Sequence, residues 1–143
     1  MNCPECGAPD HLCQPRFDEF LVLEFTDPDY GAVHNLTVAA YMIQHSSRMT
    51  REGWLYERDL LREFIVEKKS PNLIRQQIRD SVDSGKRTFK FKSRTGVPVI
   101  EKSTWKKTIL DVRDDITAWA ASVLEEAEEL DVRLSQRSAG PSG

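Results

Sequence analysis

Three cysteines lie within the first thirteen residues, MNCPECGAPDHLC, and the rest of the chain has none. Cys3 and Cys6 have the Cys-x-x-Cys spacing, which lets two thiolates bind one metal ion from a tight turn. Cys13 adds a third thiolate after six intervening residues. Because zinc favours such soft ligands, the pattern predicts a zinc site.

Two other uses of the thiols remain open. A redox-active Cys-x-x-Cys pair belongs at a helix start within a thioredoxin-like βαβ unit, and the sequence predicts no such unit. The cysteines could also be three free thiols near a frayed chain end. Their odd number argues against a disulfide framework.

A closed zinc site needs a fourth ligand, and the chain offers three histidines. His34 and His45 lie on one predicted helix about 16 Å apart, so they cannot bind the same ion. If this helix packs antiparallel to the preceding one, His45 leans back toward the level of Cys13 and His34 leans away. For His34, a hydrogen-bonded core position is the favoured interpretation. The predicted ligands are Cys3, Cys6, Cys13 and His45, with His34 as the alternative fourth ligand and His11 third.

Periodicity, caps and prolines predict the helices that position these residues. The first starts at Pro15 and is apolar over much of its circumference, so we expect it to be well buried. Asp27 and Pro28 start a second helix that runs to about His45. Further helices are expected over about 51–69, from Pro71 to a stop at Gly85, and from about residue 115.

In the stretch TFKFKSRTGVPVI, the helical spacing of apolar residues gives way to the alternating pattern of a strand. Phe89 and Phe91 alternate with lysines, SRTG is typical of a turn, and residues 97–100 could return as a strand that Pro98 keeps at an edge or irregular. The predicted fold is a mainly α-helical bundle with an N-terminal zinc-knuckle-like segment (the knuckle, residues 1–14) and a small β-hairpin or extended basic segment. We predict a single helical domain over 1–134 and a disordered tail over 135–143.

Bulk properties are those of an ordinary globular chain. Of 143 residues, 39% are hydrophobic and 30% charged, and the net charge of -3 is too small to indicate a partner. No apolar run approaches the roughly 18 residues that span a bilayer, and the N-terminus lacks the basic and hydrophobic regions of a signal peptide. We therefore expect a cytoplasmic protein without membrane association, whose thiols stay reduced.

Residues 86–107 contain eight lysines or arginines and one acid, Glu101. Two helices followed by a basic hairpin is the order of a winged helix-turn-helix, which would make nucleic acid a partner. The residues that would bind it are Arg75 and Arg79 on the second helix and Lys90, Lys92 and Arg94 on the wing. The favoured interpretation is instead an amphipathic strand with solvated lysines. The acidic stretch EEAEELD of the last helix could meet the basic segment, although a solvated surface is favoured there too.

Several stretches together resemble a known family: CPECGAP and a later cysteine, FDEFLVLEFTDPDYGAVHNLTVAAYMIQH, VDSGKRT, and TILDVRDD with AWAASVLEE. The chain resembles, up to about residue 130, an uncharacterised bacterial family of small proteins, a domain of unknown function with Cys-Pro-x-Cys-Gly, VH-x-LTV and QH motifs. The resemblance implies no activity. It places Cys3, Cys6, Cys13, His34 and His45 on the family pattern and leaves His11 outside it. Many members have an acid where Ala39 stands and a proline where Ser46 stands, so a catalytic role of that acid is not available to this chain.

The inventory for catalysis is poor. The chain has no Gly-x-Ser-x-Gly elbow, phosphate-binding glycine loop or His-Glu-x-x-His helix, and neither histidine of the second helix has the His-x-Glu context of a nucleobase deaminase. Three thiolates also make zinc a poor Lewis acid. The sequence favours a structural zinc in a binding or regulatory protein, with an unknown protein partner or self-association, over a metalloenzyme with an open zinc position.

Overall fold

The computed structural model describes residues 1–83, 92–93, 95–113 and 116–139. This part of the chain is mainly helical, as predicted. Its elements, with η for a 3-10 turn, are η1 (Pro9–His11), α1 (Cys13–Thr26), α2 (Pro28–Ala32), α3 (His34–Gln44), η2 (Ser46–Arg48), α4 (Arg51–Ile65), α5 (Pro71–Asp83), η3 (Ile109–Asp111) and α6 (Ile116–Ala139).

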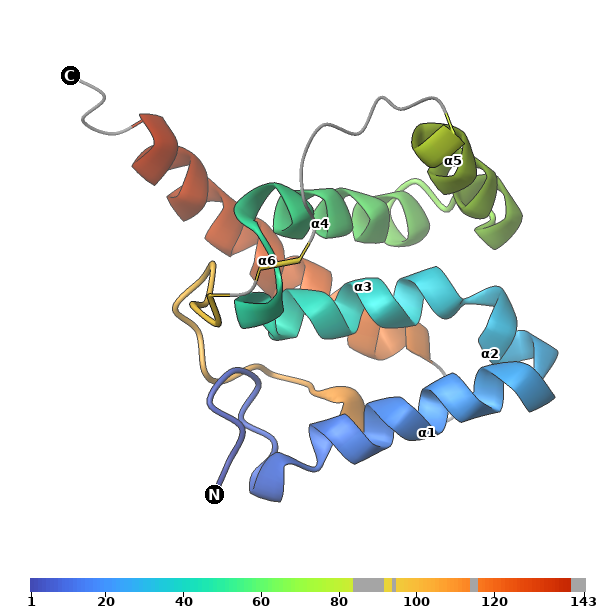
Figure 1. Cartoon of the computed structure of the whole chain (residues 1–143), viewed down its shortest axis with the longest axis horizontal. Coiled ribbons are helices and arrows are strands. Elements are labelled where there is room, and N and C mark those ends of the chain that lie inside the picture. Colours follow the sequence, from blue (N-terminus) through green and yellow to red (C-terminus); the bar gives the residue numbers. More distant parts are fainter. Residues whose placement is uncertain (84–91, 94, 114–115, 140–143) are drawn as a thin grey trace.

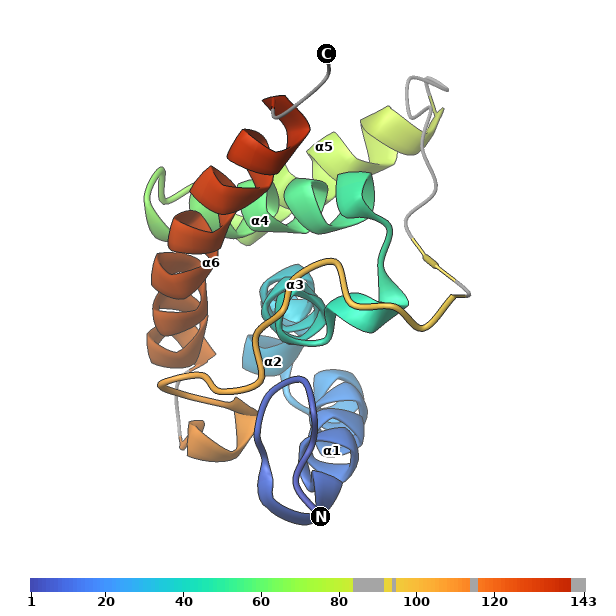
Figure 2. The same ribbon diagram turned by 90° about the vertical axis from the view of Figure 1, so that its left-hand side faces the viewer.

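Helix α3 lies at the centre of the molecule. Figure 2 views it nearly along its axis, with α1, α4 and α6 on three sides, while Figure 1 shows α5 beyond α4 at the periphery. Because α3 has neighbours on several sides, most of its side chains are buried, including the polar Thr37 and Gln44. A helix that is apolar over most of its circumference fits this central position.

Two tryptophans fill the core between α3, α4 and α6. Trp54 and Trp119 are almost completely buried. The indole N–H of Trp54 donates to the Ile43 carbonyl at 3.2 Å, and that of Trp119 donates to Gln44 Oε1 at 3.1 Å. Gln44 Nε2 in turn donates to the Lys107 carbonyl at 2.8 Å. Each buried polar tip therefore has a partner, as stable cores require.

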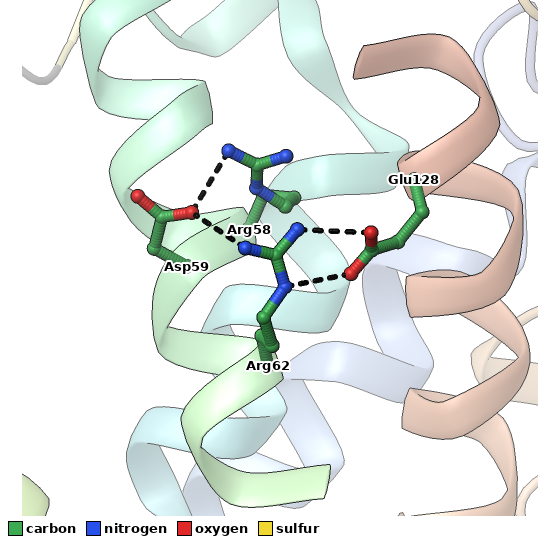
Figure 3. Close-up of polar contacts among 4 residues, drawn as sticks. All are labelled: Arg58, Asp59, Arg62 and Glu128. Atoms are coloured by element: carbon green, nitrogen blue, oxygen red, sulfur yellow. Dashed lines mark hydrogen bonds and ion pairs between the residues drawn. The ribbon is translucent and has the colours of Figure 1, made fainter. Parts of the chain in front are cut away.

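A charged contact joins α4 to α6 (Figure 3). The Arg62 guanidinium donates to both carboxylate oxygens of Glu128, at 2.8 and 2.9 Å. Asp59 lies 2.8 Å from Arg58 on the same helix. The Arg62–Glu128 pair is compatible with one relative register of the two helices, since a bidentate pair is geometrically specific.

The predicted second helix is two helices. The start at Pro28 is confirmed, with Asp27 Oδ1 accepting from the Asp29 N–H at 3.0 Å. The chain then leaves helical geometry at Val33, whose φ and ψ are -107° and 23°, before α3 begins. Just before this corner α2 packs tightly on α1, where a Cβ on Gly31 would stand 3.0 Å from the Glu24 carbonyl oxygen.

Two further helices differ from prediction. Helix α1 is not well buried: it packs along one edge of the molecule, and only Cys13, Phe17 and Phe20 are buried. Helix α4 ends at Ile65 and not near residue 69, because Lys68 takes a left-handed backbone conformation (φ 54°) that ends helices.

The predicted β-hairpin is not found in the described part of the chain. Phe89 and Phe91 lie outside it, and residues 97–100 form no strand. Backbone donors here are taken by side chains: Thr95 N–H by Ser93 Oγ, Val97 N–H by Thr95 Oγ1, and Ile100 N–H by Ser46 Oγ. Two of these bonds are local and the third comes from a distant segment, and together they take backbone donors that a hairpin ladder would use. The β pairing that the structure describes is one isolated bridge, Met49 with Lys92.

The two remaining helices agree with prediction at their starts. Helix α5 begins at Pro71, and its predicted stop at Gly85 lies outside the described residues. Helix α6 continues to Ala139, beyond the boundary predicted at 134, and 140–143 are not described. No described helix combines the length and the apolar character needed to cross a membrane.

Candidate metal centre

The knuckle folds Cys3 and Cys6 into one tight turn. The Gly7 N–H donates to the Cys3 carbonyl at 2.9 Å, and the Cys3 N–H donates to the Ala8 carbonyl at 2.8 Å. Gly7 has φ +84°, a left-handed conformation that glycine adopts without steric cost. A Cβ at this position would also lie 3.0 Å from the Ser103 carbonyl oxygen. The turn therefore needs glycine for two independent reasons.

Four potential ligands meet between the knuckle and the end of α3. Cys13 is the first residue of α1, and His45 follows the last residue of α3. The ligand atoms of Cys3, Cys6, Cys13 and His45 all lie within 4.8 Å of one another, and all four residues are buried. The three thiols are free. This cluster could hold a metal ion.

The hydrogen bonds of His45 leave one ring nitrogen available. Nδ1 lies 2.7 Å from the Tyr41 carbonyl oxygen. Because a carbonyl can only accept, Nδ1 carries the proton and Nε2 has a free lone pair. Nε2 is buried and has no hydrogen-bond partner among the described residues. A metal-ligating histidine has this arrangement, with its other ring N–H on a carbonyl.

An aromatic stack orients the His45 ring. Tyr41 stacks on His45 with ring centroids 4.0 Å apart, and Phe17 stacks on the other side of Tyr41 at 3.9 Å. The Tyr41 hydroxyl donates to Gln14 Oε1 at 3.1 Å, and Arg48 donates to the same oxygen at 2.6 Å. Residues of α1 and α3 thus both hold the His45 ring in place. Tyr41 contributes twice, because its ring stacks on His45 and its carbonyl accepts from His45 Nδ1.

Glu5, inside the Cys-x-x-Cys turn, attaches the knuckle to the body. Its carboxylate accepts from the backbone N–H and the hydroxyl of Ser47, both at 2.8 Å. Its carbonyl accepts from the Trp105 indole N–H at 3.0 Å. Glu5 therefore acts as a clamp that holds the knuckle against η2 and against the segment that precedes η3. The roles of Glu5, Tyr41 and Trp105 were not predicted from the sequence. For Tyr41 a signal was available, because residues four apart on a helix, such as Tyr41 and His45, lie on the same face.

Burial and hydrogen bonding act differently on the three thiols. Desolvation raises the pKa of Cys6 far above its ordinary value and also raises the pKa of Cys13. Burial acts in the same direction on Cys3, but hydrogen bonds from the backbone of Cys6 and Glu5 and from the side chains of Cys6 and Cys13 together outweigh it, so its pKa is lowered. A cation would stabilise all three thiolates together, because a coordinating thiol is deprotonated outright.

Burial also keeps His45 neutral. Desolvation lowers its pKa below the ordinary value, against the opposing effect of its bond to the Tyr41 carbonyl. A neutral imidazole is the form that binds metals. The ring is therefore held in the correct protonation state for coordination.

The other two histidines lie outside the cluster. His34 Nδ1 lies 2.7 Å from Glu24 Oε2, at the far end of α3, and its side chain is 47% exposed. His34 is therefore neither in the cluster nor in the core position that the sequence favoured. His11 is exposed at the end of η1.

The residues predicted to bind nucleic acid are only partly described. Arg75 and Arg79 are exposed on α5, and Lys92 is exposed at its bridge to Met49. Lys90 and Arg94 lie outside the described residues. Nucleic-acid binding through this set stays a prediction.

The acidic stretch of α6 meets part of the basic segment. Lys102 Nζ lies 3.1 Å from Glu126 Oε1, and the Lys106 N–H donates to Glu126 Oε2 at 3.0 Å. Glu126 is buried, so the favoured expectation of a solvated surface is wrong at this residue, whereas Glu125 remains exposed. These contacts neutralise part of the positive charge of residues 86–107.

Comparison with known proteins identifies a family and no activity. No curated protein and no solved structure matches the chain. A family described as being of unknown function, DUF5946, matches residues 1–134. The match covers the knuckle and every element that contributes to the cluster, and it confirms the resemblance to an uncharacterised domain family. The chain therefore belongs to the DUF5946 family of unknown function.

Proposed function

We propose that Cys3, Cys6, Cys13 and His45 bind one zinc ion that joins the knuckle to the helical body. The observation that carries this proposal is the buried Nε2 of His45, which has no hydrogen-bond partner within the described part of the chain and lies beside three buried thiols. An unsatisfied buried nitrogen costs roughly 1–3 kcal/mol unless something binds it. A cation would satisfy the nitrogen and the three sulfurs together.

The spacing of the ligand atoms favours a single ion. Four ligand atoms about 2.3 Å from a common centre stand about 3.8 Å apart in a tetrahedron. The observed upper limit of 4.8 Å between ligand atoms requires only a small contraction. Three thiolates and one imidazole are a common donor set of structural zinc sites.

The donor set also supports a structural role for zinc. Four protein ligands complete a tetrahedral shell, whereas catalytic zinc usually has three protein ligands and a water. We therefore propose a binding or regulatory protein and not an enzyme. Because thiolate ligands persist where thiols stay reduced, the proposed location is the cytoplasm.

Metal analysis with histidine variants tests this proposal. We expect purified protein to contain about one zinc per chain. Loss of an outer-shell partner already weakens metal binding by roughly 10–100-fold, so His45→Gln should lower the affinity measured by chelator competition at least as much. The matched controls His34→Gln and His11→Gln should retain the parent affinity.

Three results would overturn the proposal. One is a parent protein that is purified without metal and whose knuckle is nevertheless ordered. Another is equal loss of affinity in the His34→Gln and His45→Gln variants. The third is a zinc-bound water in X-ray absorption spectra, which would instead favour a metalloenzyme with an open coordination position.

A further inference from the structure

Helix α1 has more apolar surface than this chain covers. Its sequence, CQPRFDEFLVLEFT, is apolar over much of its circumference, which is typical of a helix buried on more than one side. One side packs toward α2, α3 and η3, through Phe17 and Phe20. On the opposite side Val22 is 64% exposed and Phe25 is 91% exposed.

These residues belong to one continuous surface, the α1 face, defined as Pro15, Asp18, Glu19, Val22 and Phe25. Spacings of three and four residues place them on the same side of the helix. All five are exposed. Pro15, Asp18, Glu19 and Val22, with Leu23 at the edge, line a shallow groove of about 580 Å³. The views in Figures 1 and 2 place α1 at an outer edge of the molecule.

The charge of this face is negative. Asp18 and Glu19 lie beside the apolar residues, and Asp29 is exposed just beyond the end of the helix. The one basic residue of α1, Arg16, is 2.7 Å from Glu19 Oε2 and its guanidinium lies over the Phe20 ring. Arg16 thus sits at the margin of the face and leaves Asp18 without a cation on this helix. A complementary surface would be apolar and positively charged.

A second copy of the chain fits this face poorly. An antiparallel pair of α1 helices centred on the middle of the helix would bring Glu19 of one copy close to Glu19 of the other. This arrangement opposes like charges, which destabilises an interface.

We propose that the α1 face binds a basic amphipathic helix of another protein. Val22 and Phe25 would contact the apolar stripe of the partner, and Asp18 and Glu19 would pair with its lysines or arginines. This is the helix-in-groove mode, in which apolar anchors recur every three or four residues. The proposal goes beyond the metal site and does not depend on which ion occupies it.

A designed peptide provides the test. The probe is a labelled synthetic helix with leucines at helical spacing and lysines at the other positions, and binding to the full chain is followed by fluorescence anisotropy. We expect Val22→Ser/Phe25→Ser to lower the affinity at least tenfold. The matched control Val66→Ser/Leu73→Ser changes two residues that are also exposed, 62% and 47%, but Val66 directly follows α4 and Leu73 lies on α5. This control should bind as the parent does.

A second pair of variants tests the charges. Asp18→Asn/Glu19→Gln should weaken binding several-fold, and the control Glu67→Gln/Glu129→Gln should not. A peptide with glutamate in place of lysine should fail to bind. Far-UV melting confirms that each variant folds, which is expected for exposed positions.

The proposal is wrong if the lysine peptide does not bind the parent chain, or binds the Val22→Ser/Phe25→Ser variant equally well. Equal binding of the glutamate peptide would also contradict it. So would a dimer of the parent chain that Phe25→Ser dissociates, because the occupant would then be a second copy.

Discussion

The knuckle and the body formed by α3, α4 and α6 are in contact, yet they bury different kinds of side chain. The body encloses two tryptophans, Trp54 and Trp119, together with leucine, isoleucine and valine side chains. The knuckle has no helix longer than the turn η1 before Cys13, and its buried side chains are three cysteines and Ala8. Apolar burial is ample in the body and small in the knuckle.

This difference shows where the stability of each region comes from. Burial of a large apolar side chain contributes about 1.5–3 kcal/mol, and the body has many of them. A fourteen-residue segment with so few cannot offset the cost of ordering its backbone, about 1–2 kcal/mol per residue. The clamp at Glu5 and the proposed metal ion would supply what the knuckle lacks, whereas the body has its own large apolar core.

Metal removal should give the largest effect. Structural zinc contributes about 10–16 kcal/mol of apparent binding energy in small zinc domains. We expect a chelator to remove amide hydrogen-exchange protection from residues 1–14 while α3 and α4 remain protected. Simultaneous loss in both regions would show that they form one cooperative unit.

The second-largest effect should come from the body. Trp54→Ala removes a side chain with no exposed surface and should lower the free energy of unfolding by about 3–5 kcal/mol in urea denaturation. Under conditions where the variant remains folded, it should still bind zinc with the parent stoichiometry. Val66→Ala, at an exposed position, should change stability by less than about 0.5 kcal/mol. If Trp54→Ala abolished metal binding in folded protein, the two regions would not be separable.

Gly7→Ala should have an intermediate effect confined to the knuckle. An L-residue with φ +84° costs about 1–2 kcal/mol, and the new Cβ would also stand 3.0 Å from the Ser103 carbonyl oxygen. Gly96→Ala is a matched control, because Gly96 has φ +70° but nothing within 4 Å of the added Cβ. Chelator competition should show weaker zinc binding for Gly7→Ala only. Parent affinity in both variants would contradict the close approach seen at Ser103.

Glu128→Gln should have the smallest effect. Its hydrogen bonds from Arg62 lower the pKa of Glu128, so the pair stabilises the fold above the ordinary carboxyl pKa of about 4.3, and the contribution disappears as the pH falls through the lowered value. Arg62 and Glu128 are 37% and 40% exposed, so water screens the pair and the expected loss near neutral pH is below about 1 kcal/mol.

Urea unfolding of metal-free parent and Glu128→Gln proteins at neutral and acidic pH measures this contribution. The two should converge in acid. Glu125→Gln, at a 68% exposed carboxylate 3.7 Å from Lys106, should match the parent at both pH values. A difference between parent and Glu128→Gln that persists in acid would assign the effect to packing and not to charge.

Local sequence signals were sufficient for features that depend on neighbouring residues. The Cys-x-x-Cys turn, the start of α2 at Asp27 and Pro28 and the start of α5 at Ser70 and Pro71 all follow from bonds within a few positions. The mainly helical fold follows in the same way from periodicity. The structure brings the three cysteines together with His45. The preference for His45 over His34 depended on an assumed antiparallel packing of two helices and not on local signals alone.

Other features depend on contacts between distant segments, and sequence patterns did not reveal them. The corner at Val33 accompanies the packing of Gly31 on Glu24, and the exposure of Val22 and Phe25 arises from the edge position of α1. Residues 97–100 lack a strand because side chains as distant as Ser46 take their backbone donors. Local patterns indicate the structural preferences of a segment. They do not indicate which face of a helix is covered or which backbone donor is satisfied, because the residues that cover the face or accept the hydrogen bond come from elements tens of residues away.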